Sequence, residues 1–142
     1  MKIFVSACLL GENCKYSGGN NLNEAVRKYV EGHTVISMCP EVEGGLPIPR
    51  TPAEIVNGVV TTEEGISVDK EFREGAKKIL DILLKEKVDL AILQSRSPSC
   101  GVGKIYDGSF SRTLIDGNGV FAQMLIDNGI KVIDSSEIEA MC

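Results

Sequence analysis

Residues 69–93 read DKEFREGAKKILDILLKEKVDLAIL and decide the fold class of this chain. Apolar residues recur here at the spacing of one helix face, namely Phe72, Ala76, Ile79, Leu80 and Leu83. Asp69 is a suitable N-cap, so the pattern predicts a helix from Asp69 to about Lys87. Residues 89–93 follow as an apolar run that predicts a buried strand. A long helix that leads straight into a buried strand is typical of an α/β domain with a parallel sheet.

The rest of the chain repeats this alternation of strand and helix. Short apolar runs predict three further strands, over 3–7, 34–38 and 130–133. Apolar residues at helical spacing predict two further helices, over 22–31 and 119–128. For the first of these helices, Asn20 and Asn21 are the expected caps.

Two segments interrupt the alternation. Residues 40–53 are rich in proline and glycine and predict a loop. Asn57-Gly58 suits a two-residue turn and predicts a hairpin over 55–60. We therefore expect one α/β domain over residues 1–142. Its fold is expected to be a three-layer, Rossmann-like (doubly wound) sandwich with a mostly parallel sheet and a small hairpin insertion.

The composition fits a globular protein and argues against several partners. Hydrophobic residues make up 43% of the 142 residues, and no apolar run approaches the ~18 residues of a membrane span. With 15 basic and 20 acidic residues the net charge is -5, whereas nucleic-acid-binding proteins are usually basic. The first residues lack the layout of a signal peptide. We expect a cytoplasmic protein that binds neither membranes nor nucleic acid.

The cysteines carry the strongest functional signal. There are five, at positions 8, 14, 39, 100 and 142, and an odd number argues for reduced thiols rather than a disulfide framework. Cys8, Cys39 and Cys100 each lie at or shortly after the end of a predicted strand. The carboxyl ends of parallel strands share one edge of the sheet, where open α/β folds bind their ligands. We therefore expect these three thiols to converge there.

The thiols admit more than one use. A free cysteine is often only a small buried hydrophobe. Structural zinc takes four ligands, usually cysteine and histidine, but the only histidine, His33, precedes a strand and falls at the opposite edge of the sheet. Soft all-thiolate ligation is compatible with an iron–sulfur cluster. Three thiolates on a [4Fe-4S] cube leave one iron open as a Lewis acid, whereas Cys14 as a fourth ligand would close the cluster.

Polar residues beside the thiols are candidates for the chemistry of the site. Glu41 follows Cys39 by two residues and is a candidate general acid or base. Ser97 and Ser99 flank Pro98 before Cys100, so either hydroxyl is a candidate to orient a water molecule, and Ser99 is also a candidate substrate-binding residue. Arg50 and Arg96 are candidates to bind a carbonyl or an anion.

A phosphate-binding loop is the main alternative for one of these segments. Gly101-Val102-Gly103-Lys104 is similar to part of a Walker A loop. The full pattern requires glycine at position 98 and serine or threonine at position 105, where this chain has Pro98 and Ile105. The sequence therefore argues against a nucleotide-phosphate site here.

Taken together, these motifs resemble the thiouracil desulfurase family nearly from end to end. The matching stretches are Ser6-Ala7-Cys8-Leu9-Leu10-Gly11, Cys14-Lys15-Tyr16-Ser17-Gly18, Cys39-Pro40-Glu41, Gly44-Gly45-Leu46-Pro47-Ile48-Pro49-Arg50, Ser95-Arg96-Ser97-Pro98-Ser99-Cys100-Gly101 and Gly117-Asn118-Gly119-Val120-Phe121. The chain departs from the family at Lys15, where arginine is more usual, and at Ser17, which replaces a common acidic residue.

The resemblance implies a [4Fe-4S] enzyme that replaces the C=S group of 2-thiouracil, or of a related thiolated base, with C=O. Carried over by motif, the cluster ligands are Cys8, Cys39 and Cys100, and the catalytic residues are Glu41 and Ser97. The partner is a small thiolated base, and the implied reaction is hydrolytic, without net electron transfer.

Two other interpretations of the same residues stay open. The first is a non-catalytic cluster or zinc protein in which Cys14 completes a shell of four thiolates. The second is a protein that binds a thiolated base without turning it over.

Overall fold

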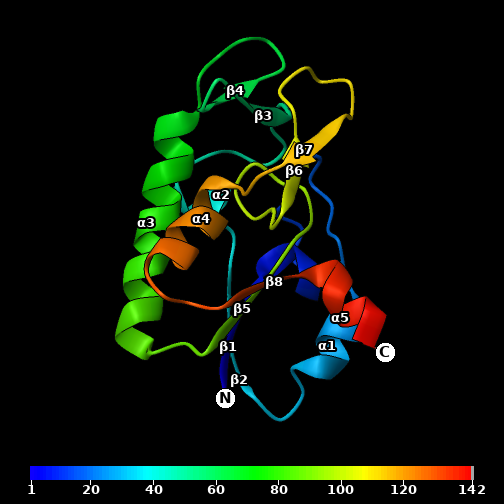
Figure 1. The fold of residues 1–142 in the computed structure, drawn as a ribbon, viewed down its shortest axis with the longest axis vertical. Coiled ribbons are helices and arrows are strands. Elements are labelled where there is room, and N and C mark those ends of the chain that lie inside the picture. The colour runs from blue at the N-terminus through cyan, green and yellow to red at the C-terminus, as the bar shows by residue number, and fades with distance from the viewer. Residues whose placement is uncertain (142) are drawn as a thin grey trace.

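The computed structural model describes residues 1–141, so Cys142 lies outside the described residues (Figure 1). Its centre is a four-stranded sheet in the order β2-β1-β5-β8. The strands are β1 (Lys2–Ser6), β2 (Thr34–Met38), β5 (Leu90–Leu93) and β8 (Val132–Asp134). All three pairings are parallel. The expected parallel sheet is therefore confirmed, and the carboxyl ends of its four strands lie along one edge.

Helices cover both faces of this sheet, which confirms the three-layer architecture. On one face, Phe4 of β1 packs in a core with residues of α3 (Asp69–Glu86) and α4 (Val120–Asp127). Phe4 and Phe121 meet edge to face, with ring centroids 5.4 Å apart. On the other face, Ile3 and Val5 pack with residues of the 3₁₀ turn η1 (Ala7–Leu10), α1 (Glu24–Tyr29) and α5 (Ser135–Met141). No helix of residues 1–141 is long and apolar enough to cross a membrane.

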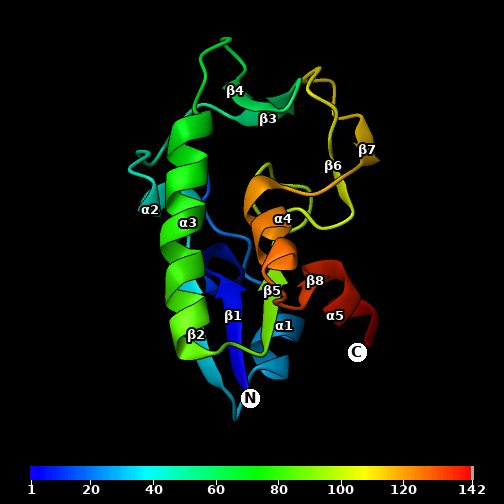
Figure 2. The same ribbon diagram turned by 60° about the vertical axis from the view of Figure 1, so that its left-hand side comes forward.

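Two hairpins rise beyond the carboxyl edge of the sheet, as Figure 2 shows. The expected one pairs β3 (Ala53–Val56) with β4 (Val59–Thr62) through Asn57 and Gly58, both of which have a positive φ. The second pairs β6 (Lys104–Tyr106) with β7 (Leu114–Asp116) and was not expected. The sequence does not predict this second hairpin, because each of its strands has only three residues and β7 is exposed throughout. No alternation of apolar and polar residues therefore marks the two strands.

The other differences from the sequence-based expectations are short or terminal elements. The helix α2 (Pro40–Glu43) lies inside the expected loop, where Pro40 occupies a first-turn position that needs no N–H. The cap of α1 is Asn23, whose side chain accepts the Val26 N–H at 3.1 Å, so the expectation of Asn20 or Asn21 was wrong. Asp69 begins α3 as a helical residue rather than as its N-cap.

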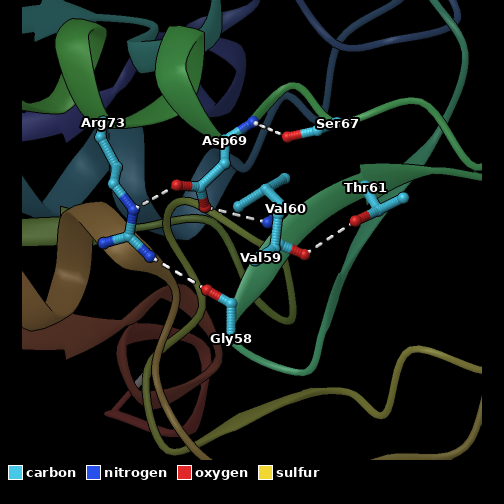
Figure 3. A network of polar contacts seen from close by, with 7 residues as sticks. All are labelled: Gly58, Val59, Val60, Thr61, Ser67, Asp69 and Arg73. Atoms are coloured by element: carbon cyan, nitrogen blue, oxygen red, sulfur yellow. Dashed lines mark hydrogen bonds and ion pairs between the residues drawn. The ribbon is translucent and has the colours of Figure 1, made fainter.

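The carboxylate of Asp69 instead joins α3 to the first hairpin, as Figure 3 shows. It accepts the Val60 N–H at 3.0 Å and the Arg73 Nε–H at 2.7 Å, and Arg73 also donates to the carbonyl of Gly58 at 3.2 Å. Burial opposes ionisation of this carboxyl, but the bonds with Arg73 and Val60 outweigh it, so the pKa of Asp69 is lowered. This network holds the hairpin in place above the sheet edge.

Candidate functional site

A cleft of about 1440 Å³ opens between the carboxyl edge of the sheet and the two hairpins. Its floor includes Ser6 and Met38 at the ends of β1 and β2, and Gln94 just after β5. Its roof includes Glu54 of the first hairpin and Tyr106 of the second. The crevice therefore lies where open parallel sheets place their ligands.

Cys8, Cys39 and Cys100 all line this cleft. Cys8 lies in η1 directly after β1, Cys39 caps α2 directly after β2, and Cys100 lies in the loop that follows β5. All three thiols are free. The three thiols therefore share the carboxyl edge as the positions of the strand ends predicted, and they come from neighbouring strands, since β2, β1 and β5 are adjacent in the sheet.

Cys14 lies between two of these thiols. It is buried, and its side chain is hydrogen-bonded to both Cys39 and Cys8, which together with burial raises the pKa of Cys14. The same bond with Cys14 lowers the pKa of Cys8 to about 7, helped by the Asn21 amide and opposed by burial. The carbonyl of Cys14 accepts a bond from Arg50 at 2.9 Å, which fixes this loop against the site.

Cys100 is the most deeply buried of the three and has two hydroxyl neighbours. Ser6 Oγ and Ser99 Oγ each lie 3.3 Å from Cys100 Sγ. Burial raises the pKa of the Cys100 thiol, and so does the negative charge of Glu41, while the two serine bonds act in the opposite direction. The site therefore offers Cys100 specific donors in place of water.

Glu41 lies beside Cys39 and close enough to Cys8 and Cys100 for its charge to act on both thiols. Its Oε2 accepts a hydrogen bond from Cys39 Sγ at 3.2 Å, and its charge raises the pKa of both Cys8 and Cys100. Glu41 also lines the cleft, so its carboxylate can reach a small molecule bound there.

The close packing of α2 on α3 positions Glu41. A Cβ added to Gly75 of α3 would lie 1.9 Å from the carbonyl oxygen of Pro40, and one added to Gly44 would lie 2.0 Å from that of Glu71. Such distances are far inside van der Waals contact, so any side chain at either position would push α2 away from α3. The two glycines therefore set where the carboxylate of Glu41 stands.

The two serines that flank Pro98 take different positions. Ser97 lines the cleft, and its Oγ accepts the backbone N–H groups of Ser99 at 3.1 Å and Cys100 at 2.7 Å. Ser99 is fully buried and is not among the residues that line the cleft. The expectation that Ser99 contacts a substrate does not fit this buried position, because its hydroxyl contacts Cys100 Sγ and does not reach the cleft.

The two candidate arginines also differ. Arg50 donates to the carbonyls of Pro47 and Cys14, so its guanidinium is committed largely to holding loops together. Arg96 is an exposed residue with a positive φ, and it lines the cleft. It is therefore better placed than Arg50 to meet a ligand.

Several residues that line the cleft were not predicted from the sequence as site residues. Those with distinctive side chains are Tyr16, Asn21, Phe110 and Arg112. They come from loops whose course depends on tertiary packing, and two of them, Phe110 and Arg112, adopt a positive φ. The one usable signal was the position of Tyr16 and Asn21 near Cys14 in the sequence.

The donor set does not suit a single metal ion. Within residues 1–141, no three side chains of His, Cys, Asp and Glu are placed to hold one ion. His33 lies at the amino end of β2 and contacts the N-terminus at 3.1 Å, so the expectation that it falls at the opposite edge is confirmed. In a cube each cysteine binds a different iron, so three thiols that line one cleft without being placed to hold one ion fit a cluster better than a single ion.

Comparisons with known proteins agree with this geometry. The family model described as 2-thiouracil desulfurase matches residues 3–137. An uncharacterised protein of Bacillus subtilis (strain 168), YbbK, is 38% identical, and the match covers 96% of this chain and 97% of that protein. A solved structure, the [4Fe-4S]-dependent thiouracil desulfidase TudS, is 39% identical with a TM-score of 0.89. That match covers 98% of this chain and 93% of the solved one.

Proposed function

Because the chain belongs to the 2-thiouracil desulfurase family, we propose that it removes sulfur from a thiolated pyrimidine such as 2-thiouracil, using a [4Fe-4S] cluster. The observation that carries this proposal is the cleft itself. Three free cysteines, which follow the ends of three neighbouring strands, line the cleft together with Glu41. A protein that only bound a base would need the cleft but not this set of thiols.

The ligands of the cluster in this proposal are Cys8, Cys39 and Cys100. All three are free and line the cleft, and soft thiolates are the ordinary ligands of iron–sulfur clusters. A cluster held by these three residues would have one open iron, which would supply Lewis-acid chemistry for a thiocarbonyl group in the cleft. Cys14 is also free and lines the cleft, but in this proposal it is not a ligand and leaves one iron open.

Glu41 acts as the general base and then the general acid. It takes a proton from the water that attacks the thiocarbonyl carbon and returns a proton as the C–S bond breaks. Water supplies the oxygen of the new C=O group and both protons of the released hydrogen sulfide. The reaction is therefore a hydrolysis and needs no electron donor.

Ser97 holds this water and the substrate in position. Its Oγ already accepts two backbone N–H groups, so the atom is fixed and its own proton remains available to donate. Arg96, which lines the cleft, is placed to bind a carbonyl oxygen of the base. The partner in this proposal is a small thiolated base. The free thiols support a reducing, cytoplasmic setting.

The amounts of uracil and sulfide that the protein forms from 2-thiouracil test this proposal. We expect cluster-loaded protein, given 2-thiouracil without any reductant, to form uracil and sulfide in equal amounts. With isotopically labelled water, the uracil oxygen at the reacting carbon should carry the label. A need for stoichiometric reductant, or unlabelled uracil, would show that the hydrolytic mechanism is wrong. Binding of 2-thiouracil by loaded protein without any product would leave a binding protein instead.

A further inference from the structure

The hydroxyl groups of Ser6 and Ser99 converge on one sulfur from two distant parts of the chain. Ser6 ends β1, whereas Ser99 immediately precedes Cys100, and each Oγ lies 3.3 Å from Cys100 Sγ. Their exposed fractions are 3% and 0%, so water does not compete for either hydroxyl. Neither residue touches the reacting atoms in the mechanism above.

The hydroxyl proton of Ser6 points toward Cys100 Sγ. Its Oγ accepts the backbone N–H of Gln94 at 3.1 Å, and its hydroxyl donates to Cys100 Sγ. Once Cys100 ligates iron its sulfur has no proton and can only accept, so Ser99 must donate as well. Two O–H donors then point at a single ligand sulfur.

The three proposed ligands therefore differ in their surroundings. Cys8 Sγ is contacted by the Asn21 amide at 3.5 Å and by the Cys14 thiol, which also contacts Cys39. Cys39 Sγ faces an acceptor, the carboxylate of Glu41, at 3.2 Å. Donors on a thiolate draw electron density away from the iron that it binds and stabilise the reduced, more negative cluster.

We propose that Ser6 and Ser99 are positioning residues that tune the cluster through Cys100, raising its reduction potential and the electron-withdrawing power of the iron. This inference rests on the proposed function, because it needs Cys100 as a cluster ligand. It assigns a role to two buried hydroxyls that the hydrolysis itself leaves unused.

Reconstituted Ser99→Ala and Ser6→Ala proteins test the proposal, with Ser37→Ala, an exposed position on β2, as the control. Ser99→Ala is the cleaner variant, because Ser6→Ala also leaves the Gln94 N–H without its acceptor. We expect both variants to keep the iron content of the wild type and to shift the reduction potential to more negative values. The control should keep the wild-type potential.

A measurement without any substitution complements the variants. Exchange of the wild type into deuterated water should shift its iron–thiolate stretching bands, and the shift should shrink in Ser99→Ala. An unchanged potential in both variants would overturn the proposal. So would loss of iron from both variants despite native folding, since the hydroxyls would then serve assembly. A wild type that takes up no cluster would instead overturn the proposed function.

Discussion

Glu41 Oε2 accepts a hydrogen bond from Cys39 Sγ at 3.2 Å, which places a carboxylate directly beside a proposed cluster ligand. The two residues are only two positions apart, and the start of α2 turns both side chains toward the cleft. The proposed general base, Glu41, and a proposed cluster ligand, Cys39, thus belong to the same short segment at the start of α2. The same segment is held against α3 by the glycines that allow the two helices to approach.

Replacement of Glu41 by glutamine should separate binding from catalysis. Gln keeps the size of the side chain but cannot take a proton, so we expect kcat to fall about 10²- to 10⁴-fold while the iron content is unchanged. Glu43→Gln is the matched control, since Glu43 lies on the same short helix and is not among the cleft residues. Steady-state kinetics on loaded protein measure the effect. Wild-type kcat in Glu41→Gln would remove Glu41 from the reaction.

Ser97→Ala should weaken both stability and turnover. The change leaves the N–H groups of Ser99 and Cys100 without their acceptor, which costs about 1–3 kcal/mol in the free energy of unfolding. Ser97→Thr keeps the oxygen and should restore most of both properties. Denaturant unfolding and kcat of the two variants provide the comparison. If Ser97→Ala were destabilised but retained full kcat, Ser97 would be a structural residue only.

Gly75→Ala should displace α2 and, with it, Glu41. The new Cβ would meet the Pro40 carbonyl oxygen at 1.9 Å, so we expect a loss of about 1–3 kcal/mol in the free energy of unfolding and a lower kcat. Glu74→Ala, at the neighbouring exposed position of α3, should change neither quantity by much. Thermal unfolding and kinetics measure the pair. Equal stability of the two variants would contradict the tight packing of α2 on α3.

Asp69→Asn should make the stability less dependent on pH. The folded-state pKa of Asp69 is lowered, so its ionised form stabilises the protein above the unfolded-state pKa of about 4. This contribution is lost as the pH falls through the lower, folded-state pKa. We expect a difference from the wild type of about 0.5 kcal/mol at neutral pH, discounted for the exposure of Arg73, that disappears in acid.

The control for Asp69 is Asp81→Asn. Asp81 pairs with Lys77 at the same helical spacing, but both side chains are more than half exposed. Its loss should therefore change the free energy of unfolding less. If denaturant unfolding gave the Asp81 variant the larger loss at neutral pH, the network that ties α3 to the hairpin would not stabilise the fold as described.

Part of the site could be predicted because the carboxyl ends of parallel strands share one edge of the sheet. Cys8, Cys39 and Cys100 come at strand ends, and parallel strands bring such ends together whatever the lengths of the segments between them. Local sequence marks those strands clearly, through continuous apolar runs. The edge of the sheet at which the cleft lies can therefore be predicted from the sequence.

The remaining features depend on packing that no local pattern records. Ser6 looks like an ordinary strand residue in the sequence, and its contact with Cys100 crosses 94 positions of the chain. Ser99 was expected to face a ligand, but the turn around Pro98 directs its hydroxyl toward the core. The hairpin of β6 and β7 is too short and too exposed to show an alternation of apolar and polar residues.

The role of Cys14 decides between an open, catalytic cluster and a closed, structural one. The most direct test is the content of iron and acid-labile sulfide after anaerobic reconstitution of the wild type, Cys14→Ser and Cys39→Ser. We expect about four irons per chain in the wild type and in Cys14→Ser, and a clear loss in Cys39→Ser. Loss of iron from Cys14→Ser, or zinc in place of iron in the wild type, would contradict a three-cysteine cluster with an open iron.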